Sequence, residues 1–467
     1  MRRYAPRFSR AGARLAAAAA LTLLGAGVLA APATAQGPAD VRINEIESSG
    51  GTPGDWVELT NIGTAAVDVS GWVVRDNDNA HAFTIAAGTS LAAGGYLVLD
   101  VESAFGLGSS DSVRLYQADG TSLVDSYTWT SHASTTYGRC PDGTGAFATT
   151  AASTRGAPNS CTIPVTAWPG GSSVSVADDT GVLGTNVSGL SYENSSLLWA
   201  VKNGPGTLYR LVPSGGKWHP DTTGGWSAGK ALHYANGAGD PDAEGVTVTP
   251  DGIMVSTERD NSHDTTSLLK VLRYDGSSTA SSLTATAEWN LTADLPAVAA
   301  NSGLEAISWI PDSYLTAHGF RDDHTGAAYN PATYAGHGSG LYFVGLEANG
   351  TVYAYALNQA GTSYTRVAGI ASGFSAVMDL EYEPATGHLW AACDDTCSGR
   401  TSTLDINAQG RSAVTAVHAR PSGMSNYNNE GFALAPQDAC VGGQKPVVWS
   451  DDSNDGSHAL RTGTLTC

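Results

Sequence analysis

Apolar and polar positions alternate over short runs between residues 41 and 161, and turns rich in glycine separate these runs. The segment lacks the three-to-four-residue spacing that is typical of an amphipathic helix. Alternation with a period of two indicates strands that bury one face. We therefore predict a sandwich or barrel of short strands. The clearest runs are residues 56–59, 71–74, 96–99, 112–115 and 124–129.

From residue 172 onwards a longer pattern repeats: an apolar strand, a turn, and a second apolar strand that ends in polar residues. Strand-rich repeats at intervals of roughly 40 to 70 residues are typical of propeller blades. We predict an all-β chain whose second part is a β-propeller of five blades, or of six if the long third repeat is really two. The last repeat has room for only three strands, so residues 172–176 are expected to supply its fourth strand and to close the ring. The first strands of the repeats begin near residues 187, 244, 304, 378 and 430.

The first 35 residues read as a secretory signal peptide: a stretch with five arginines, an apolar run over residues 15–29, and a small-x-small cleavage site at Ala33 to Ala35. A retained membrane anchor is the alternative, but the apolar run is shorter than the ~20 residues that a spanning helix needs. We therefore expect a secreted, extracellular protein without a membrane span. The predicted divisions are a signal peptide at 1–35, a sandwich at 36–162, a linker at 163–171 and a propeller at 172–467.

The formal net charge is −20, and removal of the five arginines of the signal peptide changes it to −20 − 5 = −25. Such an acidic chain is a poor partner for nucleic acid, whose phosphates need cationic contacts, and a good partner for divalent cations. Six cysteines in a secreted chain indicate three disulfides. A zinc site at Cys393 and Cys397 is a weaker alternative, because no second ligand pair lies at zinc-finger spacing. Pairing by proximity gives Cys140–Cys161, Cys393–Cys397 and Cys440–Cys467.

Three of the predicted blades place a glutamate at the same position of the first strand, and the fourth has Met378 there with Asp379 one residue later. First strands line the channel of a propeller, so these carboxylates would converge on one axis and repel each other. A Ca²⁺ ion, which accepts six to eight oxygen ligands, usually offsets such repulsion between carboxylates. The alternative is that these side chains face solvent or cap backbone amides. The predicted calcium ligands are Glu244, Glu305, Asp379 and Glu430.

Polar residues also end the second strand of every repeat. Because the second strand runs antiparallel to the first, its end returns to the face on which the first strand starts. These residues should therefore gather near the acidic ring. The candidates for catalysis are Glu258, Arg259, His318 and Asp394.

One insertion, residues 318–340, is long, polar and rich in aromatic residues. A loop of this size is either a lid or a surface decoration. As a lid, it would bring His318 or His324 beside the calcium ion, where the imidazole could act as a general base. As a decoration, its histidines would be solvated.

Several motifs of the first part resemble a lamin tail domain of the bacterial secreted type. The resemblance implies an immunoglobulin-like sandwich with an accessory or tethering role, and no chemistry of its own. The matching residues are 43–46, 54–59, 61, 67–72, 93–96, 138–143 and 157–159.

The second part resembles the SdiA-regulated family of propellers and, more loosely, the esterase-like phytase propellers. The resemblance implies five or six blades and a central calcium ion, but no settled reaction. Asp379 departs from the pattern because it is out of register. The matching residues are 188–190, 242–246, 256–260 and 429–431.

Two functions fit these observations. The first is a secreted calcium-binding protein, monomeric, with a binding or surface role toward a cell-wall glycan or another extracellular protein. The second is a calcium-dependent esterase or phosphoesterase, in which the metal polarises a small anionic ester and Arg259 holds its charge. The binding role is the preferred hypothesis.

Overall fold

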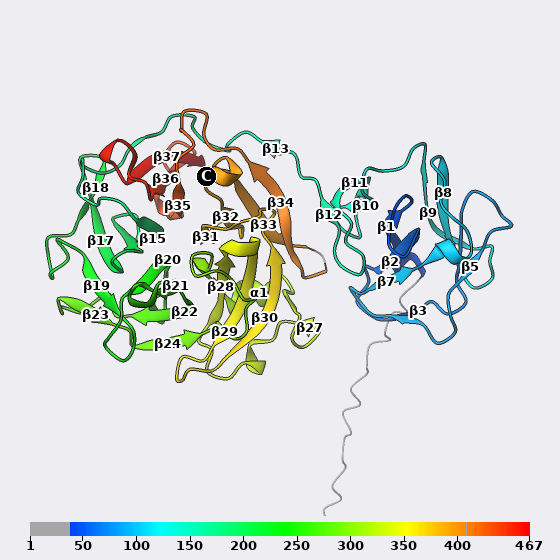
Figure 1. Cartoon of the computed structure of the whole chain (residues 1–467), viewed down its shortest axis with the longest axis horizontal. Helices are drawn as coiled ribbons and strands as arrows, with labels where there is room; N and C mark the ends of the chain where they lie inside the picture. Colours follow the sequence, from blue (N-terminus) through cyan, green and yellow to red (C-terminus); the bar gives the residue numbers. More distant parts are fainter. Residues whose placement is uncertain (1–37, 408) are drawn as a thin grey trace, which may run out of the picture.

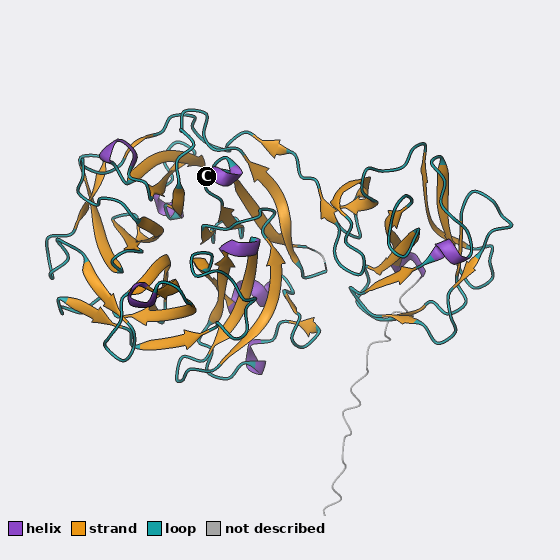
Figure 2. Cartoon of the chain, in the orientation of Figure 1, coloured by secondary structure: helices purple, strands orange, loops and turns teal. Residues whose placement is uncertain are grey.

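The computed structural model describes residues 38–407 and 409–467, and strands dominate it (Figures 1 and 2). The predicted signal peptide lies outside the described residues. The described part contains one α-helix, α1 (Asp312–Ala317), which is short. None of the helices in these ranges is long and apolar enough to cross a membrane.

The N-terminal body is a sandwich of two antiparallel sheets, as predicted. One sheet has the order β12-β11-β10-β1-β2-β7, the other β5-β4-β8-β9, and β3 pairs with β6 at the side. Alternate side chains such as Ile43, Leu59, Val74 and Leu115 are buried between the sheets. The strands are β1 (Val41–Glu47), β2 (Trp56–Asn61), β3 (Val67–Asp68), β4 (Val73–Arg75), β5 (Phe83–Thr84), β6 (Ser90–Leu91), β7 (Tyr96–Leu99), β8 (Asp111–Tyr116), β9 (Leu123–Trp129), β10 (Tyr137–Cys140), β11 (Ala146–Ala152) and β12 (Ser160–Cys161).

The C-terminal body is a propeller of five blades within the described residues. Blade 1 is built on β15, β16 and β17, and blade 2 has the order β20-β21-β22-β24. Strand β19 extends blade 1, and β23 pairs with it in parallel. The strands are β15 (Val187–Asn194), β16 (Leu197–Lys202), β17 (Thr207–Ser214), β18 (Lys217–Pro220), β19 (Lys230–His233), β20 (Pro241–Thr249), β21 (Gly252–Asp260), β22 (Ser267–Tyr274), β23 (Ser282–Thr284) and β24 (Ala287–Asn290).

The long third repeat forms one blade, with the order β25-β28-β29-β30. Its extra residues form α1 and the separate hairpin β26–β27, so the count is five blades and not six. Blade 4 has the order β34-β33-β32-β31 and blade 5 the order β37-β36-β35. The strands are β25 (Leu304–Pro311), β26 (Arg321–Asp322), β27 (Ala327–Ala328), β28 (Gly340–Leu346), β29 (Thr351–Leu357), β30 (Tyr364–Ala371), β31 (Asp379–Tyr382), β32 (Leu389–Ala392), β33 (Thr401–Ile406), β34 (Ser412–His418), β35 (Asn429–Leu434), β36 (Gln444–Asp451) and β37 (Leu460–Thr466).

The ring closes through the strand that the sequence predicts. Strand β14 (Ser175–Val176) pairs antiparallel with β37, with Ser175 opposite Thr462, and so becomes the fourth strand of blade 5. The inner strands β15, β20, β25, β31 and β35 contact one another in sequence, and β35 contacts β15 again. Figure 1 shows these strands around the centre of the propeller.

The segment that was expected to be a linker is partly docked on the propeller. Strand β13 (Val165–Thr166) pairs in parallel with β34 of blade 4. Two residues later, the indole of Trp168 is buried against Trp390 and Trp449, and its Nε1–H donates to the carbonyl of Thr464 at 2.8 Å. The segment therefore bridges blades 4 and 5 on the outside of the ring.

All three predicted disulfides are confirmed. Cys140–Cys161 joins β10 to β12 at the end of the sandwich, and Cys440–Cys467 ties the C-terminal residue to the loop before β36. The third, Cys393–Cys397, closes a turn after β32.

Glycines allow the inner strands to approach closely at one end of the ring. A Cβ atom added to Gly245 of β20 would lie 2.7 Å from the amide nitrogen of Ile307 and 2.8 Å from the carbonyl of Glu305, both in the backbone of β25. One at Gly189 of β15 would lie 2.5 Å from the carbonyl of Glu244. Because backbone cannot move aside as a flexible side chain can, only glycine permits this spacing.

We expect Gly245→Ala to lower the stability of the propeller by about 2–3 kcal/mol, the upper range for overpacking of a dense core. Thermal unfolding of the variant measures the loss. Gly369→Ala is the matched control, because Gly369 also lies in a blade strand but is exposed, and its added Cβ would meet Tyr353 at an ordinary 3.8 Å. Equal unfolding temperatures for the two variants would contradict the tight approach of β20 and β25.

Candidate functional site

Carboxylates from three blades converge at one end of the ring. Two groups have their oxygen atoms within 4.8 Å of one another: Asp242, Glu244 and Glu258 form one, and Glu258, Glu305 and Glu347 the other. The carboxylate of Glu430, from blade 5, raises the pKa of Glu244 more than any other charge. We call these six residues the axial carboxylate cluster. It includes three of the four predicted metal ligands.

Each strand glutamate of the cluster lies at an irregularity of its strand. The register of β20 shifts between Ala243 and Val246, that of β25 between Leu304 and Ala306, and that of β35 between Asn429 and Gly431. The same happens in β21 at Glu258, between Thr257 and Arg259. A β-bulge turns a side chain away from the regular alternation, and it is frequent beside active sites. The bulges therefore direct these four carboxylates toward the axis.

Several of these oxygens are buried without a hydrogen-bond donor. They are Oε2 of Glu244, Glu347 and Glu430. Glu244 is only 3% exposed. Glu258 does have a hydrogen-bond donor, because its Oε1 accepts a hydrogen bond from the amide of Gly303. Buried polar atoms nearly always have a partner, so these oxygens have room for a cation, a proton or water as theirs.

Burial and mutual repulsion raise the pKa values of the cluster. Burial is the largest cause for Glu244 and Glu305, and neighbouring carboxylates raise both pKa values further. The same causes raise the pKa of Asp242 to about 7 and that of Glu347 to about 7. Without a cation the cluster therefore retains protons near neutral pH, and a bound cation would displace them.

Of the four predicted catalytic residues, Glu258 and Arg259 lie in or beside the cluster. Nε of Arg259 is 2.6 Å from Oδ2 of Asp242, and its Nη1 donates to the carbonyl of Ala300 at 3.2 Å. The side chain is 19% exposed. The guanidinium is thus committed to Asp242 and to backbone, and it neutralises one carboxylate of the cluster.

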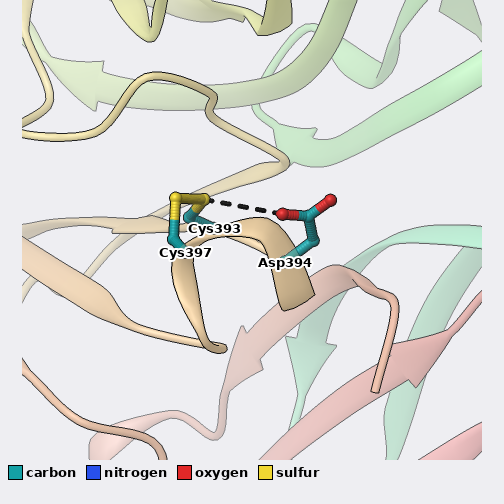
Figure 3. Close-up of side chains that lie close together, drawn as sticks. All are labelled: Cys393, Asp394 and Cys397. Atoms are coloured by element: carbon teal, nitrogen blue, oxygen red, sulfur yellow. Dashed lines mark hydrogen bonds between the residues drawn. A yellow bond between two sulfur atoms is a disulfide. The ribbon is translucent and has the colours of Figure 1, made fainter. Parts of the chain in front are cut away.

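Asp394, the third, lies at the same end of the propeller, in the turn closed by Cys393–Cys397 (Figure 3). Its charge contributes to the raised pKa values of Glu347 and Glu430. Its Oδ1 accepts from the amide and the hydroxyl of Thr396, which fixes the turn. Both sulfur atoms are in the disulfide, so neither can serve a metal as a thiolate.

His318, the fourth, lies at the other end of blade 3. The predicted second strand at residues 314–317 is wrong, because these residues belong to α1, which follows the end of β25. Since a strand rises ~3.3 Å per residue, β25 separates Glu305 from α1 by roughly 20 Å. The imidazole bonds through Nδ1 to the carbonyl of Tyr314 at 2.9 Å. The insertion therefore does not cover the cluster, and the lid interpretation is wrong.

The true second strand of blade 3 is β28, and it ends beside Glu347 in η5 (Glu347–Asn349). Glu347 therefore occupies the place that His318 was expected to take, at the end of the second strand on the face of the cluster. Glu347 was not predicted from the sequence, because the apolar residues of α1, which precedes β28, resemble a short strand. The long distance from Pro311 to Gly340 was the signal that could have found it.

Asp379 has a different environment from the other three predicted ligands. It lies in a regular part of β31, without a bulge. Its Oδ2 accepts from the amide of Phe432 at 2.7 Å and that of Leu190 at 3.4 Å, and its Oδ1 accepts from the amide of Leu380 at 2.8 Å. The carboxylate thus links the inner strands of blades 4, 5 and 1 through backbone amides.

We expect Asp379→Ala to lower stability by about 3 kcal/mol, because it leaves buried amides of two other blades without an acceptor, at about 1–3 kcal/mol each. Calorimetric titration of the folded variant with calcium should give the same result as titration of the wild type, because Asp379 is directed to backbone amides. Asp379→Asn retains one carbonyl acceptor and should lose less stability. Loss of calcium binding in Asp379→Asn with unchanged stability would instead make Asp379 a metal ligand.

Residues 34–131 match the family model of the Lamin Tail Domain, and this part of the sandwich is a lamin tail domain. The matched region ends before β10, but β10, β11 and β12 complete the same sheet. No curated protein matches the chain.

The solved structures that match the chain are distant. A protein of unknown function from Bacteroides caccae is 9% identical, with 61% of this chain and 82% of that chain covered and a TM-score of 0.31. The allergen Mala s 1 of Malassezia sympodialis is 9% identical, with 63% and 82% covered and a TM-score of 0.33. A protein from Lactobacillus plantarum is 12% identical, with 88% and 90% covered and a TM-score of 0.28. None of the three is described as an SdiA-regulated or phytase-like protein.

Proposed function

We propose that the protein is a secreted calcium-binding propeller with an extracellular binding role, and that its lamin tail domain is an accessory module. The observation that carries this proposal is the set of buried, unpartnered carboxylate oxygens from blades 2, 3 and 5. Carboxylates so close together in a protein interior need a cation or protons to offset their repulsion. A cation on the axis would also link blades 2, 3 and 5 at the centre of the ring.

The donor set favours calcium over other metals. Both groups of the cluster consist of carboxylates alone, which suits hard cations that take oxygen ligands. The ligands come from strand bulges in separate blades and from one short 3-10 helix, an arrangement without evident octahedral symmetry. Ca²⁺ tolerates irregular coordination by six to eight oxygens, whereas Mg²⁺ demands near-ideal octahedral geometry.

The position of His318 favours binding over hydrolysis. The hydrolase hypothesis needs a histidine or a carboxylate as general base beside the metal. His318 lies at the opposite end of blade 3, which leaves this role to a carboxylate such as Glu258 that the cation would also take as a ligand. Arg259, expected to hold an anionic substrate, is paired with Asp242. Glu430 and Asp452 are partly exposed at the rim of the cluster and leave the metal accessible to an external ligand. A wall glycan or another extracellular protein is the proposed partner.

Metal analysis and titration calorimetry of the mature protein test this function. We expect calcium to co-purify or to bind on titration, with Mg²⁺ at the same concentration binding much more weakly. p-Nitrophenyl acetate and p-nitrophenyl phosphate should show no turnover above background. Turnover that EDTA abolishes would support the esterase hypothesis, and the absence of any calcium binding would overturn the proposal.

A further inference from the structure

We infer that the axial carboxylate cluster holds two divalent cations bridged by Glu258. This inference rests on the proposed function and deepens it. Glu258 belongs to both groups of converging carboxylates: with Asp242 and Glu244 on one side, and with Glu305 and Glu347 on the other. The first position therefore lies within blade 2, and the second lies between blades 2 and 3.

When all its glutamates are ionised, the cluster needs more than one divalent ion for charge balance. Arg259 neutralises Asp242, which it contacts at 2.6 Å. The other five members of the cluster are glutamates, with five negative charges when ionised. One divalent cation would leave a net charge of −3 in a buried site, whereas two would leave −1. Uncompensated buried charge is costly, so full ionisation favours the second ion. The five are Glu244, Glu258, Glu305, Glu347 and Glu430.

Each position has its own unpaired acceptor. Oε2 of Glu244 serves the first and Oε2 of Glu347 the second, and both atoms are buried without a donor. Between them, Glu258 is 1% exposed, and the amide of Gly303 holds its Oε1. Oxygen atoms of Glu305, Glu258 and Glu347 all lie within 4.8 Å of one another, a spacing at which one cation can contact all three carboxylates.

The two positions differ in burial. Asp242, Glu244 and Glu258 are all buried, whereas Glu347 is partly exposed. Water can therefore complete the coordination of the second ion more easily than that of the first. The second ion should bind more weakly, exchange faster, and be the one that an oxygen-bearing ligand reaches from outside.

Calcium titration of the chelator-treated mature protein tests this inference. We expect two calcium ions per chain, in two steps that differ at least tenfold in affinity. Glu347→Gln should abolish the weaker step and leave the stronger one within about threefold of wild type. Glu193→Gln is the matched control, because Glu193 is exposed near the far end of β15, and it should leave both steps unchanged.

Electron paramagnetic resonance of the Mn²⁺-loaded protein reports the bridge directly. Two ions that share Glu258 should give an exchange-coupled spectrum at saturation, and Glu347→Gln should give the spectrum of an isolated ion. One ion per chain at saturation would overturn the two-ion inference and leave the proposed function standing. Two uncoupled ions, both unaffected by Glu347→Gln, would overturn the bridge. No bound ion at all would overturn the proposed function as well.

Discussion

Replacing Glu244 by glutamine should weaken calcium binding about 100-fold, which corresponds to about 2.7 kcal/mol. Glu244 is only 3% exposed, its Oε2 has no hydrogen-bond donor, and the charges of Glu430 and Glu258 both raise its pKa. Glutamine has the same shape but lacks the charge, so a cation loses a ligand and much of its electrostatic attraction. Titration calorimetry against calcium at pH 7.5 measures the effect.

The same substitution should raise the unfolding temperature of the calcium-free protein. In the absence of a cation, burial and the charges of Glu430, Glu258 and Asp242 raise the pKa of Glu244, so folding near neutral pH costs either the uptake of a proton or a repelled charge. Glutamine removes that cost, and opposite signs for binding and stability would exclude misfolding as the cause of weak binding. The control Glu193→Gln should change neither quantity, because the glutamine carbonyl can still accept the hydrogen bond that Trp199 Nε1 donates to Glu193. If the Glu244→Gln variant binds calcium as tightly as the wild type, Glu244 is not a ligand of the site.

Small residues explain why three glutamates of the cluster could be found in the sequence. Each of Glu244, Glu305 and Glu430 is followed by glycine or alanine, because the inner strands are too close there for a larger side chain. The repeat of acid and small residue therefore marks the axis of the ring. The strand β14, which closes the ring, was predictable for a related reason: a blade with three strands leaves an unpaired edge.

The rest of the site depends on pairing that no single strand reveals. Asp379 stands one residue from the expected position, but its strand has no bulge, so the side chain meets backbone amides instead of the axis. Whether a strand bulges depends on its partner strand. Glu347 was missed because the apolar run around Leu315 forms a helix, and a run of four residues does not distinguish a short helix from a strand.

The calcium-free propeller should lose stability as the pH rises from about 5 to about 8, and calcium should restore it. Burial raises the pKa of Asp242 to about 7 and that of Glu347 to about 7 in the folded protein. A carboxyl group with a raised folded-state pKa binds more protons folded than unfolded. Its stabilising contribution is therefore complete below its ordinary pKa and is lost as the pH rises through about 7. A pKa raised to about 7, as for Asp242, corresponds to a loss on the order of a few kcal/mol.

Calcium replaces the protons, so its stabilising effect should be small at pH 5 and large at pH 8. Differential scanning calorimetry at both pH values, with calcium or with EDTA, measures this. The lamin tail domain is an internal control: burial raises the pKa of Glu58 to about 7 as well. However, Asn44 and the amide of Gly156 donate to that carboxylate. The unfolding temperature of the lamin tail domain should therefore fall as the pH rises, whether or not calcium is present. If calcium does not change the unfolding temperature of the propeller at pH 8, protons and not a metal ion neutralise the carboxylates of the cluster.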